Sequence, residues 1–273
     1  MRVIGWGATD VGRKRNHNED SFLCNNEMAL YAVADGMGGH LGGERASRMA
    51  VEILEREIAE VRKAGLFDAR PADAPPGAPH PIASLLRKAV VEADRHIYEA
   101  AMHNPELAGM GTTLTALLFY GGYVHLGHVG DSRAYLYRDG RARQLSEDHS
   151  WIQEQVRAGL ISPEEAKESR FRNIITRSVG FEPSVEPDLQ GLSVQAGDCF
   201  VLCSDGLSNY LTVEELAQVM TGHCYRDVPT VFIDLANERG GDDNVTCLAI
   251  YAGNEDGNQD GNQDGNQDGN EEG

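Results

Sequence analysis

An apolar run that stops at an aspartate and continues into a cluster of glycines constrains this chain more than any other feature. Residues 30–34 are long enough for a buried strand, Asp35 follows them, and a helical pattern begins near Glu44. A carboxylate at the end of a strand, beside a backbone that only glycine allows, can hold a hard cation. The alternative is an ordinary strand-to-helix turn in which Asp35 caps the helix.

The same arrangement recurs along the chain. A small residue and Asp-Gly follow an apolar run at Asp35 and again at Asp205. Further acids flank predicted strands at Asp131, at Asp243 and at Glu19-Asp20. If these strands belong to one sandwich, their ends bring the carboxylates together, and such a cluster needs cations to offset its repulsion. Ligands that are all oxygen favour magnesium or manganese over zinc or copper.

Arg15 lies just before Asn18-Glu19-Asp20 and adds a permanent cation beside these acids. Its guanidinium either neutralises the carboxylates or binds a phosphate through two hydrogen bonds. Two divalent ions about 3.5–4 Å apart can share a water, lower its pKa and direct it at phosphorus, so that no protein nucleophile is required. The chain accordingly contains no GxSxG, HCxxxxxR or P-loop pattern.

The apolar periodicity predicts an α+β fold in one domain. Strands are expected at residues 3–10, 21–25, 28–34, 110–119, 123–129, 133–137, 194–203 and 245–251. Helices are expected at residues 43–63, 82–102 and 228–239, with a further short helix capped by Thr212 and Glu215. Many strands with helices near both ends of the chain indicate an antiparallel sandwich covered by helices.

Three segments fall outside this pattern. Residues 64–81 are rich in Pro, Ala and Gly and predict a surface connection. Residues 146–180 are charged, contain several arginines and are interpreted as an insert or lid. From Gly253 the chain repeats Gly-Asn-Gln-Asp units, so residues 253–273 are predicted to be a disordered acidic tail. A solvated spacer is favoured for this tail over a string of weak calcium ligands.

The composition excludes several kinds of partner. The formal net charge of the 273 residues is -19, which argues against binding to nucleic acid or to anionic membranes. No apolar run is long enough to span a bilayer, and the N-terminus lacks the apolar core of a signal peptide. The five cysteines form no CxxC pair, which is typical of buried thiols in a reducing cytoplasm. A cytoplasmic location is therefore expected.

Seven short motifs, in order and with sensible spacing, resemble a known family over about residues 9–251. They are Asp10-Val11-Gly12, Arg15-Asn16-His17-Asn18-Glu19-Asp20, Ala34-Asp35-Gly36-Met37-Gly38-Gly39-His40, Gly111-Thr112-Thr113, Val129-Gly130-Asp131-Ser132-Arg133, Cys203-Ser204-Asp205-Gly206-Leu207 and Asp243-Asn244-Val245-Thr246. The sequence resembles the metal-dependent serine/threonine protein phosphatases of the 2C type, in their compact bacterial form. The resemblance implies a four-layer α-β-β-α sandwich, with a catalytic domain at residues 1–252 and a flap at about 146–180.

The resemblance also implies a role for each matching residue. Two core ions, manganese or magnesium, and a weaker third are expected. By this resemblance Asp35 would bridge the two core ions, the Gly36 carbonyl would bind the first ion, and Glu19 and Asp20 would hold waters around it. Asp205 and Asp243 would bind the second ion, and Asp131 with Asp205 would bind the third. Arg15 would bind the phosphate, and Asn244 would orient Asp243 or a water. Gly111-Thr112-Thr113 is expected to serve the strand and turn rather than the chemistry.

The implied activity is hydrolysis of phosphoserine and phosphothreonine on proteins by a metal-bridging water, without a phosphoenzyme. The partners would be phosphorylated proteins, among them a bacterial Ser/Thr kinase or its substrates, and the protein would be a monomer. The rival interpretations are a non-catalytic regulator with this fold and a two-metal hydrolase of nucleotides or other small phosphates.

One departure from the family concerns proton donation. Many eukaryotic relatives have a histidine directly after Asp-Gly, where this chain has Met37, which cannot give a proton. The acid would then be a metal-bound water near Asp131 or a residue such as His40.

Overall fold

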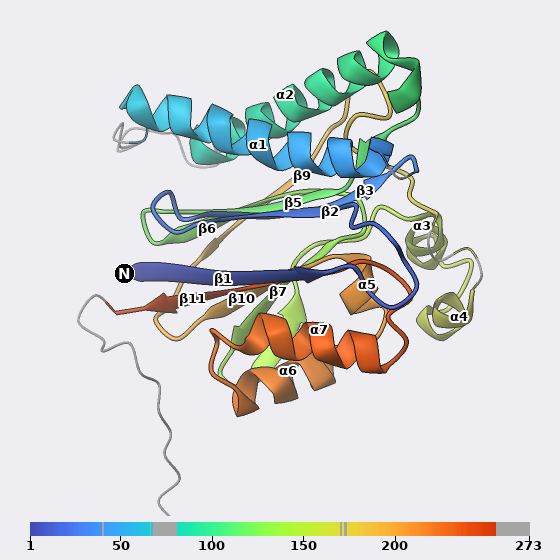
Figure 1. The fold of residues 1–273 in the computed structure, drawn as a ribbon. Helices are drawn as coiled ribbons and strands as arrows, with labels where there is room; N and C mark the ends of the chain where they lie inside the picture. Colours follow the sequence, from blue (N-terminus) through green and yellow to red (C-terminus); the bar gives the residue numbers. More distant parts are fainter. Residues whose placement is uncertain (40, 66, 68–80, 170, 172–173, 255–273) are drawn as a thin grey trace, which may run out of the picture.

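The chain folds into four layers. The computed structural model describes residues 1–39, 41–65, 67, 81–169, 171 and 174–254. Two sheets stack face to face, with α1 (Leu41–Lys63) and α2 (Pro81–His103) covering one outer face and α6 (Val213–Gly222) and α7 (Val228–Glu238) covering the other (Figure 1). This arrangement confirms the predicted α-β-β-α sandwich.

Every described strand pairing within the two sheets is antiparallel. The first sheet has the order β1 (Arg2–Asp10), β11 (Val245–Gly253), β10 (Cys199–Cys203), β7 (Arg133–Arg138) and β8 (Arg141–Gln144). The second has the order β2 (Asp20–Asn25), β3 (Leu30–Met37), β5 (Leu114–Tyr120), β6 (Tyr123–Val129) and β9 (Asp188–Ser193), and the short β4 (Gly111–Thr112) pairs with β3. The first and last strands of the chain are therefore neighbours.

The central strands are apolar on both faces because both faces are covered. In β3, Leu30, Ala32 and Ala34 pack against α1 and α2, whereas Tyr31 and Val33 point into the layer between the sheets. Since successive side chains of a strand point to opposite faces, a strand between two apolar layers becomes a continuous apolar run. In β10, Phe200 and Leu202 face the other sheet while the alternate residues face α6 and α7.

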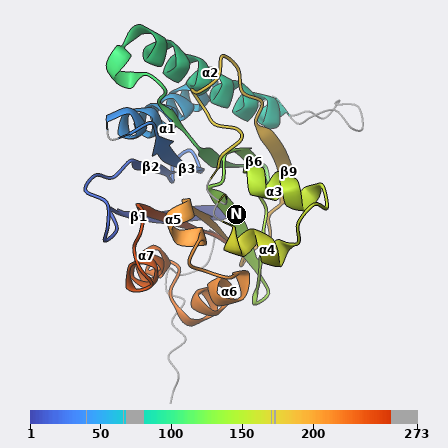
Figure 2. The ribbon, with the colours of Figure 1, turned by 90° about the vertical axis from the view of Figure 1, so that its right-hand side faces the viewer.

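The helices follow the expected apolar spacing. The buried face of α1 includes Ala46, Ala50, Leu54 and Ile58, which recur every four residues and rest on the second sheet. The capping box at the start of α6 is present, because Glu215 N–H donates to the Thr212 hydroxyl and the Glu215 carboxylate accepts from Thr212 N–H. Between β8 and β9 lie α3 (Trp151–Arg157) and α4 (Pro163–Glu168), which project from one end of the sandwich (Figure 2).

The structure differs from the sequence expectation at several boundaries. The strand predicted at residues 194–203 begins only at Cys199, and β8 and β9 were not predicted. Both missed strands lie at sheet edges and carry partly exposed polar side chains, so they lack the apolar run that marks the central strands. Strand β3 continues through Asp35 to Met37, and Asp205 opens the one-turn helix α5 (Asp205–Ser208). His40, most of the 64–81 connection and the repeats beyond residue 254 lie outside the described residues.

Replacing Phe200 with Ala should lower the free energy of unfolding by about 3–5 kcal/mol, because it removes a fully buried ring from the layer between the sheets. This ring also meets Phe119 edge to face, with centroids 5.2 Å apart. Urea unfolding checks the prediction. Phe181→Ala, whose ring is 60% exposed, is the control and should change the free energy by less than about 1 kcal/mol.

Candidate metal centre

Five aspartates from both sheets come together at one end of the sandwich, and we call them the carboxylate cluster. Its members are Asp20, Asp35, Asp131, Asp205 and Asp243. Asp20 and Asp35 are direct cross-strand partners of β2 and β3. Burial raises the pKa of Asp35 well above its usual range, and the charges of the other four members raise it further. The sequence prediction placed these same side chains at strand ends.

The backbone of Asp35 is held by two threonines, Thr112 at the end of β4 and Thr113 between β4 and β5. Asp35 N–H donates to Thr113 Oγ1 (2.9 Å), while Thr113 N–H (2.8 Å) and Thr112 Oγ1 (2.9 Å) donate to the Asp35 carbonyl. Both threonines are fully buried. These bonds fix the main chain at Asp35, the residue whose pKa is raised by all four other members of the cluster.

Gly36 brings three segments of backbone into contact behind the cluster. Its N–H donates to the Glu19 carbonyl (3.2 Å). A Cβ at this position would overlap the Gly43 carbonyl and lie 2.6 Å from the Glu19 carbonyl oxygen, so only glycine fits between them. The Glu19 side chain itself lies against Gly43 at the start of α1.

Asp20 carries the clearest local sign that a cation fits here. Its Oδ2 accepts hydrogen bonds from Ser204 Oγ (2.8 Å) and Thr246 Oγ1 (2.6 Å). Its Oδ1 is buried, and no hydrogen-bond partner reaches it among the described residues. Burial raises the pKa of Asp20 to about 7. A buried carboxylate oxygen without a donor suits a bound cation or one of its waters.

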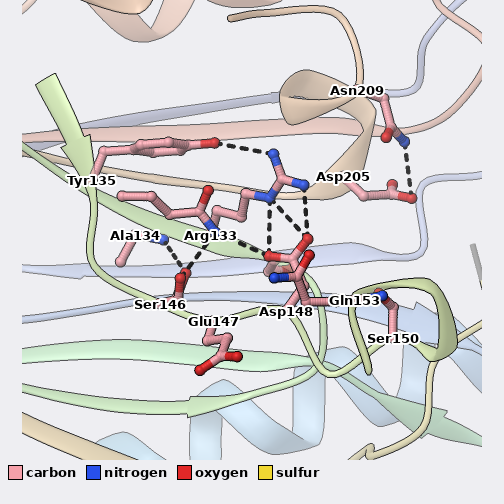
Figure 3. A network of polar contacts seen from close by, with 12 residues as sticks. Arg133, Ala134, Tyr135, Ser146, Glu147, Asp148, Ser150, Gln153, Asp205 and Asn209 are labelled. Atoms are coloured by element: carbon pink, nitrogen blue, oxygen red, sulfur yellow. Dashed lines mark hydrogen bonds and ion pairs between the residues drawn. The ribbon is translucent and has the colours of Figure 1, made fainter. Parts of the chain in front are cut away.

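Asp131 and Asp205 form the other end of the cluster. Burial, and then the charges of Asp205 and Asp148, raise the pKa of Asp131 to about 8. Burial and the Asp243 charge raise the pKa of Asp205, although hydrogen bonding with Asp35 and Asn209 opposes the shift. Asn209 Nδ2 donates to Asp205 Oδ2 at 3.3 Å across α5 (Figure 3).

Arg15 lies beside the cluster on the loop between β1 and β2. Its Nη2 donates to Asp243 Oδ2 at 2.7 Å, and half of its side chain is exposed. Asn244 holds this loop, because its Nδ2 donates to the carbonyls of Val11 and His17 and its Oδ1 accepts from Glu19 N–H. Only the backbone N–H of Asn244 reaches the Asp243 carboxylate (2.8 Å), so its side chain grips the loop rather than Asp243.

Among the described residues, no group of three or more acidic, histidine or cysteine side chains is arranged so that it could hold a metal ion by itself. Bound cations would therefore take further ligands from the backbone and from water, as magnesium commonly does. Met37 ends β3 opposite Gly111, and its thioether has no proton to give.

The comparisons with known proteins agree with this geometry. Residues 11–230 match the family model described as protein phosphatase 2C. The chain belongs to the protein phosphatase 2C family. The serine/threonine phosphatase Stp of Listeria monocytogenes is 38% identical over 246 residues, which cover 89% of this chain and 93% of the relative.

Solved structures of such phosphatases share the fold. The S. agalactiae serine/threonine phosphatase has a TM-score of 0.80 and 35% identity, covering 92% of this chain and 99% of its own. The catalytic domain of the phosphatase PstP in complex with two manganese ions has a TM-score of 0.77 and 34% identity, covering 92% of this chain and 99% of its own. This chain is thus a serine/threonine protein phosphatase of a metal-dependent family. None of its described helices has the length and apolarity required to cross a membrane.

Sequence reasoning missed one group of residues in this phosphatase. Arg133 donates from Nε (3.0 Å) and Nη2 (2.7 Å) to the two carboxylate oxygens of Asp148, beside Asp205 (Figure 3). His149 follows and is only 6% exposed, and it lies in none of the motifs that the sequence analysis singled out. Asp148 and His149 lie between the short edge strand β8 and α3, where no apolar periodicity draws attention to them. The one available signal was the N-cap Ser150, which accepts from Gln153 N–H.

The raised pKa values predict how the metal-free phosphatase responds to pH. Because Asp20 and Asp131 titrate near pH 7 and 8 when folded and near 4 when unfolded, the folded state binds protons that the unfolded chain releases. The free energy of unfolding in EDTA should therefore fall as the pH rises from about 5 to 8, by up to about 1.4 kcal/mol per pH unit for each linked proton. Urea unfolding at pH 5.5 and 8 measures this.

Asp35→Asn should stabilise the metal-free protein at pH 8, since it removes the central charge of the cluster. Asp139→Asn, at an exposed turn, makes the same change of charge away from the cluster and is the control. A stability that is flat or rises with pH would contradict the mutual repulsion of the carboxylates.

Proposed function

We propose that this phosphatase hydrolyses phosphoserine and phosphothreonine on proteins with two manganese or magnesium ions and a weaker third. The observation that carries the proposal is the carboxylate cluster, in which burial and mutual repulsion raise the pKa of Asp35 and an oxygen of Asp20 lacks a donor among the described residues. When bound, the cations would offset these charges, lower the pKa of a water shared between them and direct it at phosphorus in a single step.

Each acid of the cluster has a proposed place. Asp35 would bridge the two core ions, and the Gly36 carbonyl would complete the first. Asp205 and Asp243 would hold the second ion, and Asp131 together with Asp205 would hold the third ion. Glu19 and Asp20 would hold waters around the first ion. The donor set is oxygen throughout, which fits hard ions.

Arg15 is proposed to bind the phosphate. Its contact with Asp243 engages one guanidinium nitrogen, and its exposed half leaves the fork accessible to a phosphate beside the cluster. Because Met37 cannot donate a proton, the leaving oxygen would take its proton from water at the Asp131 side of the cluster or from His40. Asn244 would hold Arg15 and Glu19 in place by fixing the loop between β1 and β2.

The cellular setting is proposed from the family and from charge. The substrates would be proteins phosphorylated by a bacterial Ser/Thr kinase, and the phosphatase would oppose that kinase as a cytoplasmic monomer. Residues 146–180 would act as a flap that influences access of the substrate, and residues 253–273 would be an acidic spacer. The net charge of -19 argues against nucleic acid as a partner.

Asp35→Asn should lower manganese-dependent release of phosphate from a phosphothreonine peptide by roughly 10²–10⁴-fold, because it weakens the ligand shared by both core ions. The assay compares this peptide with a nucleotide and with p-nitrophenyl phosphate, each with manganese and with EDTA. Asp139→Asn should retain full activity. Preference for the nucleotide would support the small-phosphate hydrolase, and absence of manganese-dependent release would support the non-catalytic regulator.

Arg15→Lys should reduce kcat/KM for the phosphopeptide by about 10- to 100-fold, because an ammonium keeps the charge but loses the two-pronged hydrogen bond. Arg13→Lys, two residues away on the same loop and also exposed, is the matched control and should change kcat/KM little. An unchanged kcat/KM in Arg15→Lys would show that the positive charge alone is sufficient, and equal losses in both variants would contradict a specific role of Arg15.

A further inference from the structure

The start of the flap is fastened to the turn that carries Asp131. We call residues 147–150 the flap root and residues 130–132 the Asp131 turn. His149 N–H donates to the Gly130 carbonyl at 2.7 Å, and Gly130 N–H donates to His149 Nδ1 at 3.0 Å. His149 therefore satisfies both backbone groups of one buried glycine.

This pair of hydrogen bonds defines the chemical form of His149. Since Gly130 N–H is the donor, Nδ1 carries no proton and the neutral ring has its proton on Nε2. Nε2 lies 3.1 Å from Asp188 Oδ2, at the start of β9, which can accept that proton. Arg177 Nη1 donates to Asp188 Oδ1 at 2.7 Å and also lies 3.1 Å from His149 Nε2. Because a guanidinium can only donate, the acceptor for the Nε2 proton is Asp188, which Arg177 holds in place. Burial lowers the pKa of His149, which also favours the neutral ring.

Two neighbouring contacts strengthen the junction. Arg133 directly follows the Asp131 turn and holds Asp148 through two guanidinium nitrogens (Figure 3). His128, the penultimate residue of β6, donates from Nε2 to the Glu147 carbonyl at 2.9 Å. Its Nδ1 lies 2.9 Å from Thr115 Oγ1. The rings of His128 and His149 lie 4.7 Å apart, and burial lowers the pKa of His128 to about 4.

The Asp131 turn is also linked to Asp35. Ser132 Oγ lies 2.7 Å from Thr113 Oγ1, the same hydroxyl that accepts Asp35 N–H. Gly130 has a φ of +108°, and a Cβ there would lie 2.5 Å from Thr113 Cγ2. The turn is therefore held between Thr113 on the side of the carboxylate cluster and His149 on the side of the flap.

We propose that His149 is a positioning residue, whose unprotonated Nδ1 fixes the Gly130 amide and thereby sets the Asp131 carboxylate for the third cation. The effect on catalysis rests on the proposed function of Asp131 as a ligand of the third cation. The hydrogen bond between the Gly130 amide and His149 Nδ1 does not depend on that function. Nothing in this role requires His149 to touch the phosphate. A change at the flap root reaches the cluster through one turn, because Gly130 in that turn bonds to His149 and Ser132 lies within hydrogen-bond distance of Thr113.

The wild-type chain tests the assignment without any substitution. With ¹⁵N-labelled histidine, the nitrogen spectrum of His149 should be that of a neutral ring protonated on Nε2. A proton on Nδ1 would overturn the proposal, because that nitrogen could no longer accept the Gly130 amide.

A matched pair of variants tests the consequence. In His149→Asn the side-chain oxygen stands where Nδ1 stood, whereas in His149→Gln it reaches toward the position of Nε2. Hydrogen exchange of the Gly130 amide should be about tenfold or more faster in His149→Gln than in His149→Asn, as expected when a buried donor loses its acceptor. The manganese concentration for half-maximal activity should likewise be higher in His149→Gln than in His149→Asn, while KM for the phosphopeptide should change less.

Exchange at the buried Leu202 of β10, a strand paired on both sides, separates positioning from a general loss of stability. Faster exchange at Gly130 alone supports the proposal. Equal acceleration at both amides, or equal exchange in the two variants, overturns it. Asp131→Asn tests separately whether Asp131 binds a third cation. An unchanged manganese dependence in that variant would refute the third cation site, and the exchange result would still decide the role of His149.

Discussion

Repulsion between buried carboxylates is the constraint on which the rest of this structure depends. Five aspartates from two sheets share one end of the sandwich, and each ionised group makes the others harder to ionise. At Asp35 the fold holds the main chain, through Thr112 and Thr113, whereas at Asp20 one carboxylate oxygen is bound by Ser204 and Thr246 and the other is left without a donor among the described residues. Such an oxygen is left for a cation, and the protein stores an unfavourable charge that metal binding can relieve.

The loops around the cluster are as firmly built as the strands. Asn244 ties the last strand to the loop that carries Arg15 and Glu19, and Gly36 lets α1 approach that loop. A motif such as Asp243-Asn244 therefore has two kinds of residue, one facing the cluster and one fixing a neighbouring segment. Loss of Asp243 would remove an acid of the carboxylate cluster, whereas loss of Asn244 would release the backbone of the loop between β1 and β2.

The sandwich architecture and the acids of the carboxylate cluster could be predicted from the sequence better than the edge strands and the residues that hold the backbone around the cluster. Strands β3, β10 and β11 could be predicted because apolar neighbours on both faces demand an unbroken apolar run. Strands β8 and β9 could not, since an edge strand with polar side chains resembles a loop. Asp148 and His149 were missed for a related reason: their importance lies in contacts with Arg133 and Gly130, which no local periodicity reveals.

The pairing of the first and last strands has a consequence for biosynthesis. Strand β11 lies between β1 and β10, so these two strands of the first sheet stay apart until β11 has been made. Asp243 and Asn244 precede that strand, and they supply one acid and the clamp of the Arg15 loop. A nascent chain that stops before Asp243 thus carries four of the five acids of the carboxylate cluster, but it lacks the strand that joins β1 to β10.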